Sequence, residues 1–158
     1  MITMWIASTV QRMQASQYRR DGLSFLVLTL LWGLFFWRAL TPREVDRVSL
    51  PEGDFSGQFV AFGAYQTSRL LEGEIPLWNP YNYAGHPFLA DTQAAVLYPP
   101  RLVTIFVSQF TDGWSYDALT GEVLAHYLLA SFLTYIFLRT SIGSSSAGIV
   151  GALIFTYG

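Results

Sequence analysis

The sequence predicts an all-α integral membrane fold, the N-terminal part of a multi-spanning helical bundle whose exported first loop contains interfacial helices. Hydrophobic residues make up 52% of the 158 residues and charged residues only 13%, whereas soluble domains have about a quarter charged. Residues 23–37 contain no charge, and a second apolar segment follows at residues 118–138. Composition and these two segments together indicate a chain that lies in lipid.

The charge and cysteine content exclude some classes of partner. The net charge is −2, the pI is about 5.5, and the nine basic residues are all arginines spread along the chain. A nucleic-acid partner is therefore not expected. Cysteine is absent, so the sequence offers neither a disulfide framework nor a thiolate metal site.

The first transmembrane helix is predicted at residues 22–40, after a cytoplasmic N-terminal segment at residues 1–21. Its apolar part would be about 27 Å long as a helix, and Arg38 lies near the end, where its stem can reach the interface. A cleaved signal peptide is the alternative. Trp37 is too bulky for a cleavage site around Ala39, so an uncleaved signal anchor is favoured.

The second transmembrane helix is predicted at residues 118–138, followed by a cytoplasmic turn at residues 139–145. Only Glu122 and His126 interrupt it, and residues four apart share one helical face. Ionisable residues inside a span usually face a bundle interior or a cavity. A structural hydrogen bond between helices is the favoured interpretation, ahead of a ligand role.

A third transmembrane helix is predicted to start at residues 146–158. This segment is shorter than the roughly 20 residues needed to cross, so we expect a longer protein and a fragment that is inactive alone. Serines precede the helix and can cap it. Gly148 and Ala152 form a small-xxx-small pattern, which predicts close approach to neighbouring helices.

Arginine placement predicts the orientation. Arg12, Arg19 and Arg20 precede the first span and Arg139 closes the second, so the positive-inside rule places both flanks in the cytoplasm. Residues 41–117 are then exported from a multi-pass protein of the cytoplasmic membrane, with the lipid bilayer as a partner.

The exported loop is predicted to contain four parts. A charged connector at residues 41–54 leads to an amphipathic helix at about residues 55–72, which Gly73 ends and which would lie on the bilayer surface. A loop rich in proline and aromatic residues follows at residues 73–100. An apolar helix at about residues 101–110 is too short to cross and is predicted to be interfacial.

The polar and aromatic residues of this region are the candidates for chemistry. Asp54 precedes the first amphipathic helix, as an N-cap or as a carboxylate placed to take a proton from an acceptor hydroxyl. Asp91 and Gln93 cap local backbone or face a polar ligand. Five aromatic side chains fit either the headgroup layer or stacking on sugar rings: Trp78, Tyr81, Tyr83, Phe88 and Tyr98.

These residues occur in an order that resembles a known family. Asp54 and Gln58 are followed by "LLEGEIPLWNPYNYAGHPFLADTQAAVLYPP", then by His126 and "FLRTSIGSSSAGIVGALIF". This order resembles the N-terminus of YfhO-type bacterial membrane proteins, within the GT-C glycosyltransferase superfamily. The likeness covers the chain from about residue 22 to the end, and its most specific elements are G-x-x-P-L-W-N-P and Y-P-P.

The resemblance implies an enzyme of the bacterial cytoplasmic membrane. Such an enzyme transfers a sugar from a polyprenyl-phosphate-linked donor to a glycan, lipid or protein acceptor on the outer face. Asp54 matches the family's essential acid and is the candidate general base. The residues expected to contact substrate are Gln58, Trp78, Asn79, His86, Asp91, Gln93 and Arg101.

The negative charge on the leaving phosphate needs a positive charge to offset it. A divalent cation, Mg²⁺ or Mn²⁺, is the candidate cofactor, and Arg69 or Arg101 could serve instead. GT-C members often carry two acids together here, whereas Asp54 has apolar or small neighbours. A metal-binding pair is therefore not implied, and Asp91 is the candidate second acid.

Two other functions are compatible with the sequence. A non-enzymatic membrane subunit or scaffold could use the aromatic exported loop to dock a partner. A transporter could use Glu122 and His126 as a proton relay.

Overall fold

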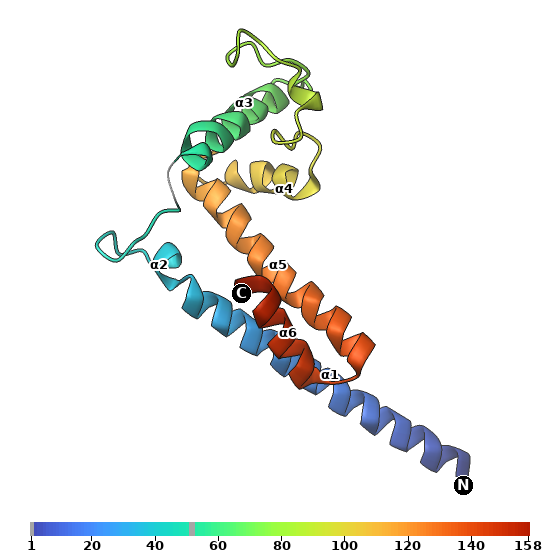
Figure 1. Cartoon of the computed structure of the whole chain (residues 1–158). Helices are drawn as coiled ribbons and strands as arrows, with labels where there is room; N and C mark the ends of the chain where they lie inside the picture. Colours follow the sequence, from blue (N-terminus) through green and yellow to red (C-terminus); the bar gives the residue numbers. More distant parts are fainter. Residues whose placement is uncertain (1, 51–52) are drawn as a thin grey trace. The chain divides into compact units, whose positions relative to one another are not determined.

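The computed structural model describes residues 2–50 and 53–158, with the backbone alone for residues 2–14, and the described secondary structure is helical (Figure 1). The elements are α1 (Ile2–Phe35), α2 (Trp37–Leu40), the π-helix η1 (Phe55–Phe59), α3 (Val60–Leu71), the 3₁₀ helix η2 (Phe88–Ala90), α4 (Pro99–Ser108), α5 (Tyr116–Ile142) and α6 (Ser145–Tyr157). The all-α prediction is confirmed.

The chain forms two compact units. The first unit contains residues 1–47 and 125–158, and the second contains residues 48–124. Helix α5 contributes its first residues, up to Leu124, to the second unit and the rest to the first.

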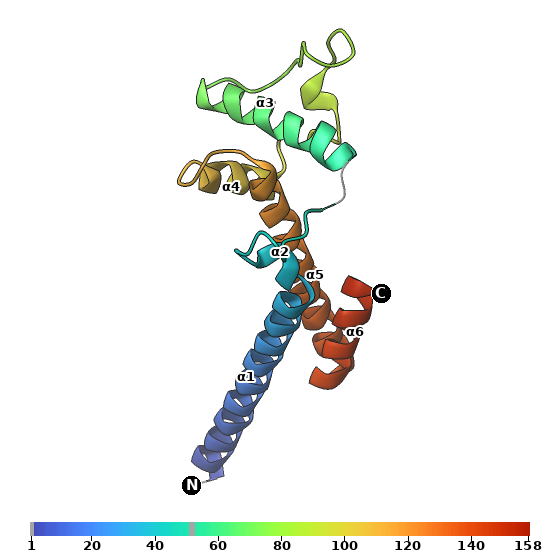
Figure 2. The same cartoon turned by 90° about the vertical axis from the view of Figure 1, so that its left-hand side faces the viewer.

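The core of the first unit lies between α1, α5 and α6, which Figure 2 shows close together. Leu28, Tyr135 and Ala152 are at most 1% exposed and come from these three helices. A Cβ on Gly148 would lie 2.9 Å from the Tyr135 ring. The small residues of α6 therefore permit the close approach that their spacing predicts.

The carboxylate of Asp21 links two helices of the first unit by hydrogen bonds. Asp21 Oδ1 accepts hydrogen bonds from the Tyr135 hydroxyl at 2.6 Å and from Arg139 Nε at 3.1 Å. Both donors lie on α5, so Asp21 joins α1 to α5 and compensates the charge of Arg139. No local pattern in the sequence predicts this role of Asp21.

The first predicted span differs from the structure at both ends. Helix α1 starts at Ile2, and it is interrupted at Phe36, so residues 22–40 do not form one continuous helix. Phe36 has φ −97° and ψ 15°, in the sparsely allowed bridge region. Its ring packs edge-on against Tyr127 of α5 at 5.0 Å. This tertiary contact, invisible in the local sequence, accompanies the break.

Among the residues that the structure describes, one helix is long and apolar enough to cross a membrane, and it is α5. It begins two residues before the predicted span and ends four residues after it. Helix α6 is apolar but only 13 residues long. Its predicted serine cap is present, because Ser144 Oγ accepts a hydrogen bond from the backbone N–H of Ala147.

The two helices predicted in the central loop are both present in the second unit, as η1 with α3 and as α4. Gly73 ends α3 with φ +79°, and the Glu74 N–H bonds back to the Arg69 carbonyl at 2.9 Å, as in a Schellman cap. Helix α4 starts earlier than predicted because Pro99 and Pro100 occupy its first positions. A helix N-terminus leaves N–H groups unpaired, so proline fits there.

The apolar faces of these two helices have different environments. Phe62 of α3 is 1% exposed and packs against the chain's own loop, so this side chain is not available to lipid. The placement of α3 on the bilayer surface stays a prediction. Helix α4 buries Arg101, Ile105 and Ser108. Its other side exposes Leu102, Val103, Phe106 and Val107, with Phe110 just beyond the helix. The interfacial role of α4 stays a prediction.

Candidate functional site

The proline-rich segment folds onto α3 over a small apolar core. Phe62 of α3 contacts Phe88, Ala94 and Val96 of the loop. Two hydrogen bonds add to the core: Gln66 Nε2 donates to the Val96 carbonyl at 2.9 Å, and the Tyr65 hydroxyl donates to the Trp78 carbonyl at 2.6 Å. Phe88 is fully buried, so it neither lies in the headgroup layer nor stacks on a sugar, and both predicted alternatives are wrong for this residue.

A short hairpin projects from this core at residues 79–86. The backbone groups of Asn79 and His86 form two reciprocal hydrogen bonds of 2.9 Å. Asn79 Oδ1 accepts from the Tyr81 N–H at 2.9 Å, which is the Asx-turn that asparagine favours. Asn79 is 2% exposed, so it shapes the hairpin and is not placed to contact a substrate.

The tip of the hairpin has a left-handed backbone. Tyr83, Ala84 and Gly85 have φ angles of +54°, +59° and +105°. A Cβ on Gly85 would lie 2.7 Å from Trp78 Nε1, so both the backbone angle and the indole require glycine there. Trp78 is 54% exposed, and its indole packs against the hairpin at Gly85.

Four of the predicted substrate residues lie in one polar chain. His86 Nε2 lies 3.4 Å from Asp91 Oδ2, which is longer than a normal hydrogen bond. Asp91 Oδ1 accepts from the Gln93 N–H at 2.8 Å. Gln58 Nε2 of η1 donates to Gln93 Oε1 at 2.6 Å. These side chains link the proline-rich loop to η1, the turn that precedes α3.

Asp54 lies at the start of η1, four residues before Gln58 and on the same side of the helix. It is exposed, and its side chain makes no capping hydrogen bond, so the N-cap interpretation is not supported. A π-helical turn follows it, and such turns are frequent at functional sites.

A pocket of about 330 Å³ opens beside Gln58. We call it the hairpin pocket, and its lining residues are Gly57, Gln58, Phe62, Tyr81, Asn82 and Tyr83. The sequence indicated the two tyrosines as stacking surfaces, and Gln58 through the family resemblance. It did not indicate Asn82, because a single asparagine between two tyrosines has no distinctive spacing.

Arg101 and Glu122 form a buried ion pair between α4 and α5. Arg101 Nε donates to both carboxylate oxygens at 2.8 and 3.1 Å, and both side chains are 7% exposed. The guanidinium lies 4.9 Å from the ring centroid of Trp114. This pairing agrees with the structural interpretation of Glu122, and it corrects the predicted contact of Arg101 with a phosphate.

Trp114 connects the Arg101–Glu122 ion pair to α3. Its Nε1 donates to the Val60 carbonyl at 2.8 Å, and the indole packs so closely against Gly63 that a Cβ there would collide with it. Arg69, the other candidate cation, is paired with Glu72 at 2.7 Å and also with Glu74. Neither arginine lines the hairpin pocket.

Gly63→Ala is expected to lower the free energy of unfolding by about 1–3 kcal/mol, because the indole is held on both sides and overpacking dominates. Gly121→Ala is the matched control. A Cβ on Gly121 meets nothing within 4 Å, so helix propensity alone should raise stability by about 0.5–1 kcal/mol. Thermal unfolding of both variants tests this, and equal shifts would contradict the packing of Trp114.

His126 lies on α5 in the first unit, whereas Glu122 lies on α5 in the second unit.

In the described residues there is no group of three or more His, Cys, Asp or Glu side chains that could hold a metal ion. His86 and Asp91 alone do not make the coordination set that Mg²⁺ or Mn²⁺ prefers. The described residues therefore do not fit the candidate divalent cation.

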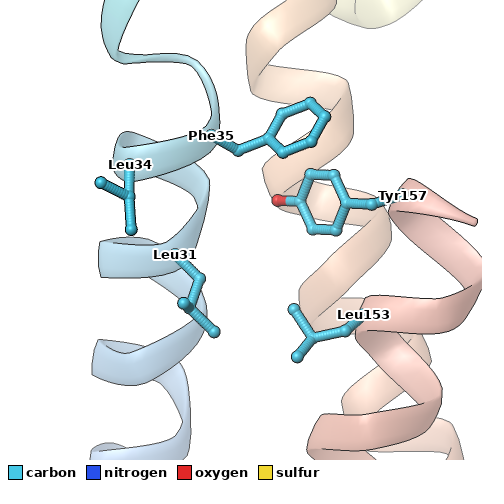
Figure 3. A pocket seen from close by; sticks show the side chains of 5 residues that line it. All are labelled: Leu31, Leu34, Phe35, Leu153 and Tyr157. Carbon is cyan, nitrogen blue, oxygen red and sulfur yellow. The ribbon is translucent and has the colours of Figure 1, made fainter.

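A second pocket, of about 570 Å³, lies in the first unit between α1 and α6 (Figure 3). Its lining side chains are Leu31, Leu34, Phe35, Leu153 and Tyr157. All are apolar except for the phenol of Tyr157, so no charged side chain lines this pocket.

Comparisons with known proteins do not define a relative. No family model, no curated protein and no solved structure matches this chain.

Proposed function

We propose that the chain belongs to a membrane glycosyltransferase. It moves a sugar from a polyprenyl-phosphate-linked donor to an acceptor at the outer face of the bacterial cytoplasmic membrane. One observation carries this proposal: Asp54 is an exposed carboxylate one helical turn from Gln58, which lines the hairpin pocket. The resemblance to YfhO-type proteins supports it, and so does α5 as a candidate span.

The reaction assigns one task to Asp54. Its carboxylate takes the proton of an acceptor hydroxyl while the hydroxyl oxygen attacks the anomeric carbon of the donor. The bond between that carbon and the phosphate oxygen breaks, and polyprenyl phosphate leaves with the electron pair. Neither Arg69 nor Arg101 is assigned to this phosphate, because both are paired with glutamates.

A docking subunit is the second candidate. The exposed apolar side of α4 favours it, with Val103, Phe106 and Phe110 each at least 61% exposed. Exposed patches of this kind mark protein or membrane contacts. A proton relay through Glu122 loses support, since that carboxylate is committed to Arg101.

Sugar transfer by the full-length protein tests the proposal. Membranes that contain it would be supplied with radiolabelled glucose, galactose or N-acetylglucosamine linked to polyprenyl phosphate. We expect label from at least one donor to move into an acceptor fraction, and no such movement in membranes without the protein. If label stays in the donor lipid for all three sugars, the transferase proposal is wrong and docking becomes the leading function.

A further inference from the structure

We propose that the hairpin pocket binds the neutral ring of a pyranose and not a phosphate. This inference rests on the proposed function and deepens it, because it says which part of a sugar substrate this pocket holds. It is carried by the lining chemistry of the pocket, by the open faces of two tyrosines and by the strained backbone that presents one of them.

The lining of the pocket matches a sugar and does not match an anion. None of its six residues is charged, whereas a buried phosphate needs arginine, lysine or converging N–H donors. The amides of Gln58 and Asn82 and the tyrosine hydroxyls can each donate and accept, as sugar hydroxyls also do. A volume of about 330 Å³ is at the small end of ligand pockets and suits a single ring.

One hydrogen bond fixes the amide of Gln58, which lines this pocket. Gln58 Nε2 donates a hydrogen bond to Gln93 Oε1 at 2.6 Å. The Gln58 amide is thereby held in one orientation, and its Oε1 makes no hydrogen bond to the described residues. A sugar hydroxyl can donate to this oxygen without displacing any contact that holds the loop.

The two tyrosines have their ring faces open. Tyr81 and Tyr83 are 80% and 86% exposed, and each is steadied by an edge contact. The Tyr81 ring meets Tyr65 at 5.8 Å and the Tyr83 ring meets His86 at 6.1 Å, both with interplanar angles of 77°. An edge-to-face contact covers at most one face of a ring, so at least one π-face of each exposed tyrosine is left for the apolar C–H side of a sugar ring.

The backbone at Tyr83 points to the same conclusion. A bulky residue with positive φ is uncommon, and the fold holds it in that conformation at a cost in backbone energy. Tyr83 gains little burial to offset this cost, since its side chain is almost fully exposed. The paired groups of Asn79 and His86 hold the turn closed. A strained turn that presents an exposed aromatic ring is typical of a ligand-contacting position.

Saturation-transfer NMR on the full-length protein in detergent would test this, with methyl glucoside, methyl galactoside and methyl N-acetylglucosaminide as probes. We expect at least one probe to bind. Tyr83→Ala should weaken its binding by about tenfold, and Tyr83→Phe should keep most of it because the ring remains. Tyr18→Ala, at another exposed tyrosine on α1, is the matched control and should bind as the unmodified protein does.

Several results would overturn the inference: no probe binds, Tyr83→Ala binds as tightly as the unmodified protein, or inorganic phosphate displaces the bound sugar. The Asp54→Asn variant separates it from the proposed function, because that variant should still bind the probe. Sugar transfer without binding of any probe would remove this inference alone. Binding without transfer from any donor would remove the proposed function alone.

Discussion

Asp54→Asn in the full-length protein is expected to lower kcat for sugar transfer by about 10²–10⁴-fold, the usual contribution of a general base. Asparagine has nearly the same shape but cannot take a proton from an acceptor hydroxyl. Binding of the donor should change little, since Asp54 makes no capping hydrogen bond and is not among the residues that line the pocket. The loss should therefore appear in kcat and in kcat/KM together, with KM nearly constant.

The fold of this variant should be unaffected. Asp54 is exposed and makes no capping hydrogen bond, so the thermal unfolding midpoint should stay within a degree or two of the original, as for other surface changes. Asp112→Asn is the control, because Asp112 is also exposed and lies in the same unit outside the pocket. Transfer rates that match in the two variants would remove Asp54 from the reaction.

Elements with local signals could be predicted from the sequence. Gly73 marks the end of α3 because a left-handed residue closes a Schellman cap, and the observed φ of +79° agrees. The serines before α6 predict its cap, which Ser144 provides. The small residues Gly148 and Ala152 predict close packing, and both are buried. In each case the information lies within a few residues of the feature.

Features that depend on tertiary contact could not be predicted. The break at Phe36 accompanies a ring contact with Tyr127, a residue of a distant helix. In the candidate site, Gln58 and Gln93 meet across 35 residues, and one sequence carries no sign of this pairing. Asn79 is among the residues expected to contact substrate, but its burial, which excludes that contact, is not visible in the sequence.

Arg101→Ala is expected to lower the free energy of unfolding by about 3–5 kcal/mol, because it leaves the carboxylate of Glu122 buried without its partner. Both side chains are 7% exposed, so water replaces the lost partner poorly. Arg69→Ala is the matched control. Its partners Glu72 and Glu74 are 57% and 60% exposed, and exposed pairs contribute at most about 1 kcal/mol.

A double variant separates the charge from the packing. Arg101→Met with Glu122→Leu removes both charges and keeps apolar volume beside Trp114, so it should recover most of the stability lost in Arg101→Ala. The stability of Arg101→Lys should lie between those of Arg101→Ala and the double variant, since an ammonium keeps the charge but loses the planar group above the indole. Unfolding of the full-length protein, monitored by Trp fluorescence, would rank the stabilities of these variants. If the double variant is as unstable as Arg101→Ala, the arginine stem and the indole stabilise this junction, and the ion pair does not.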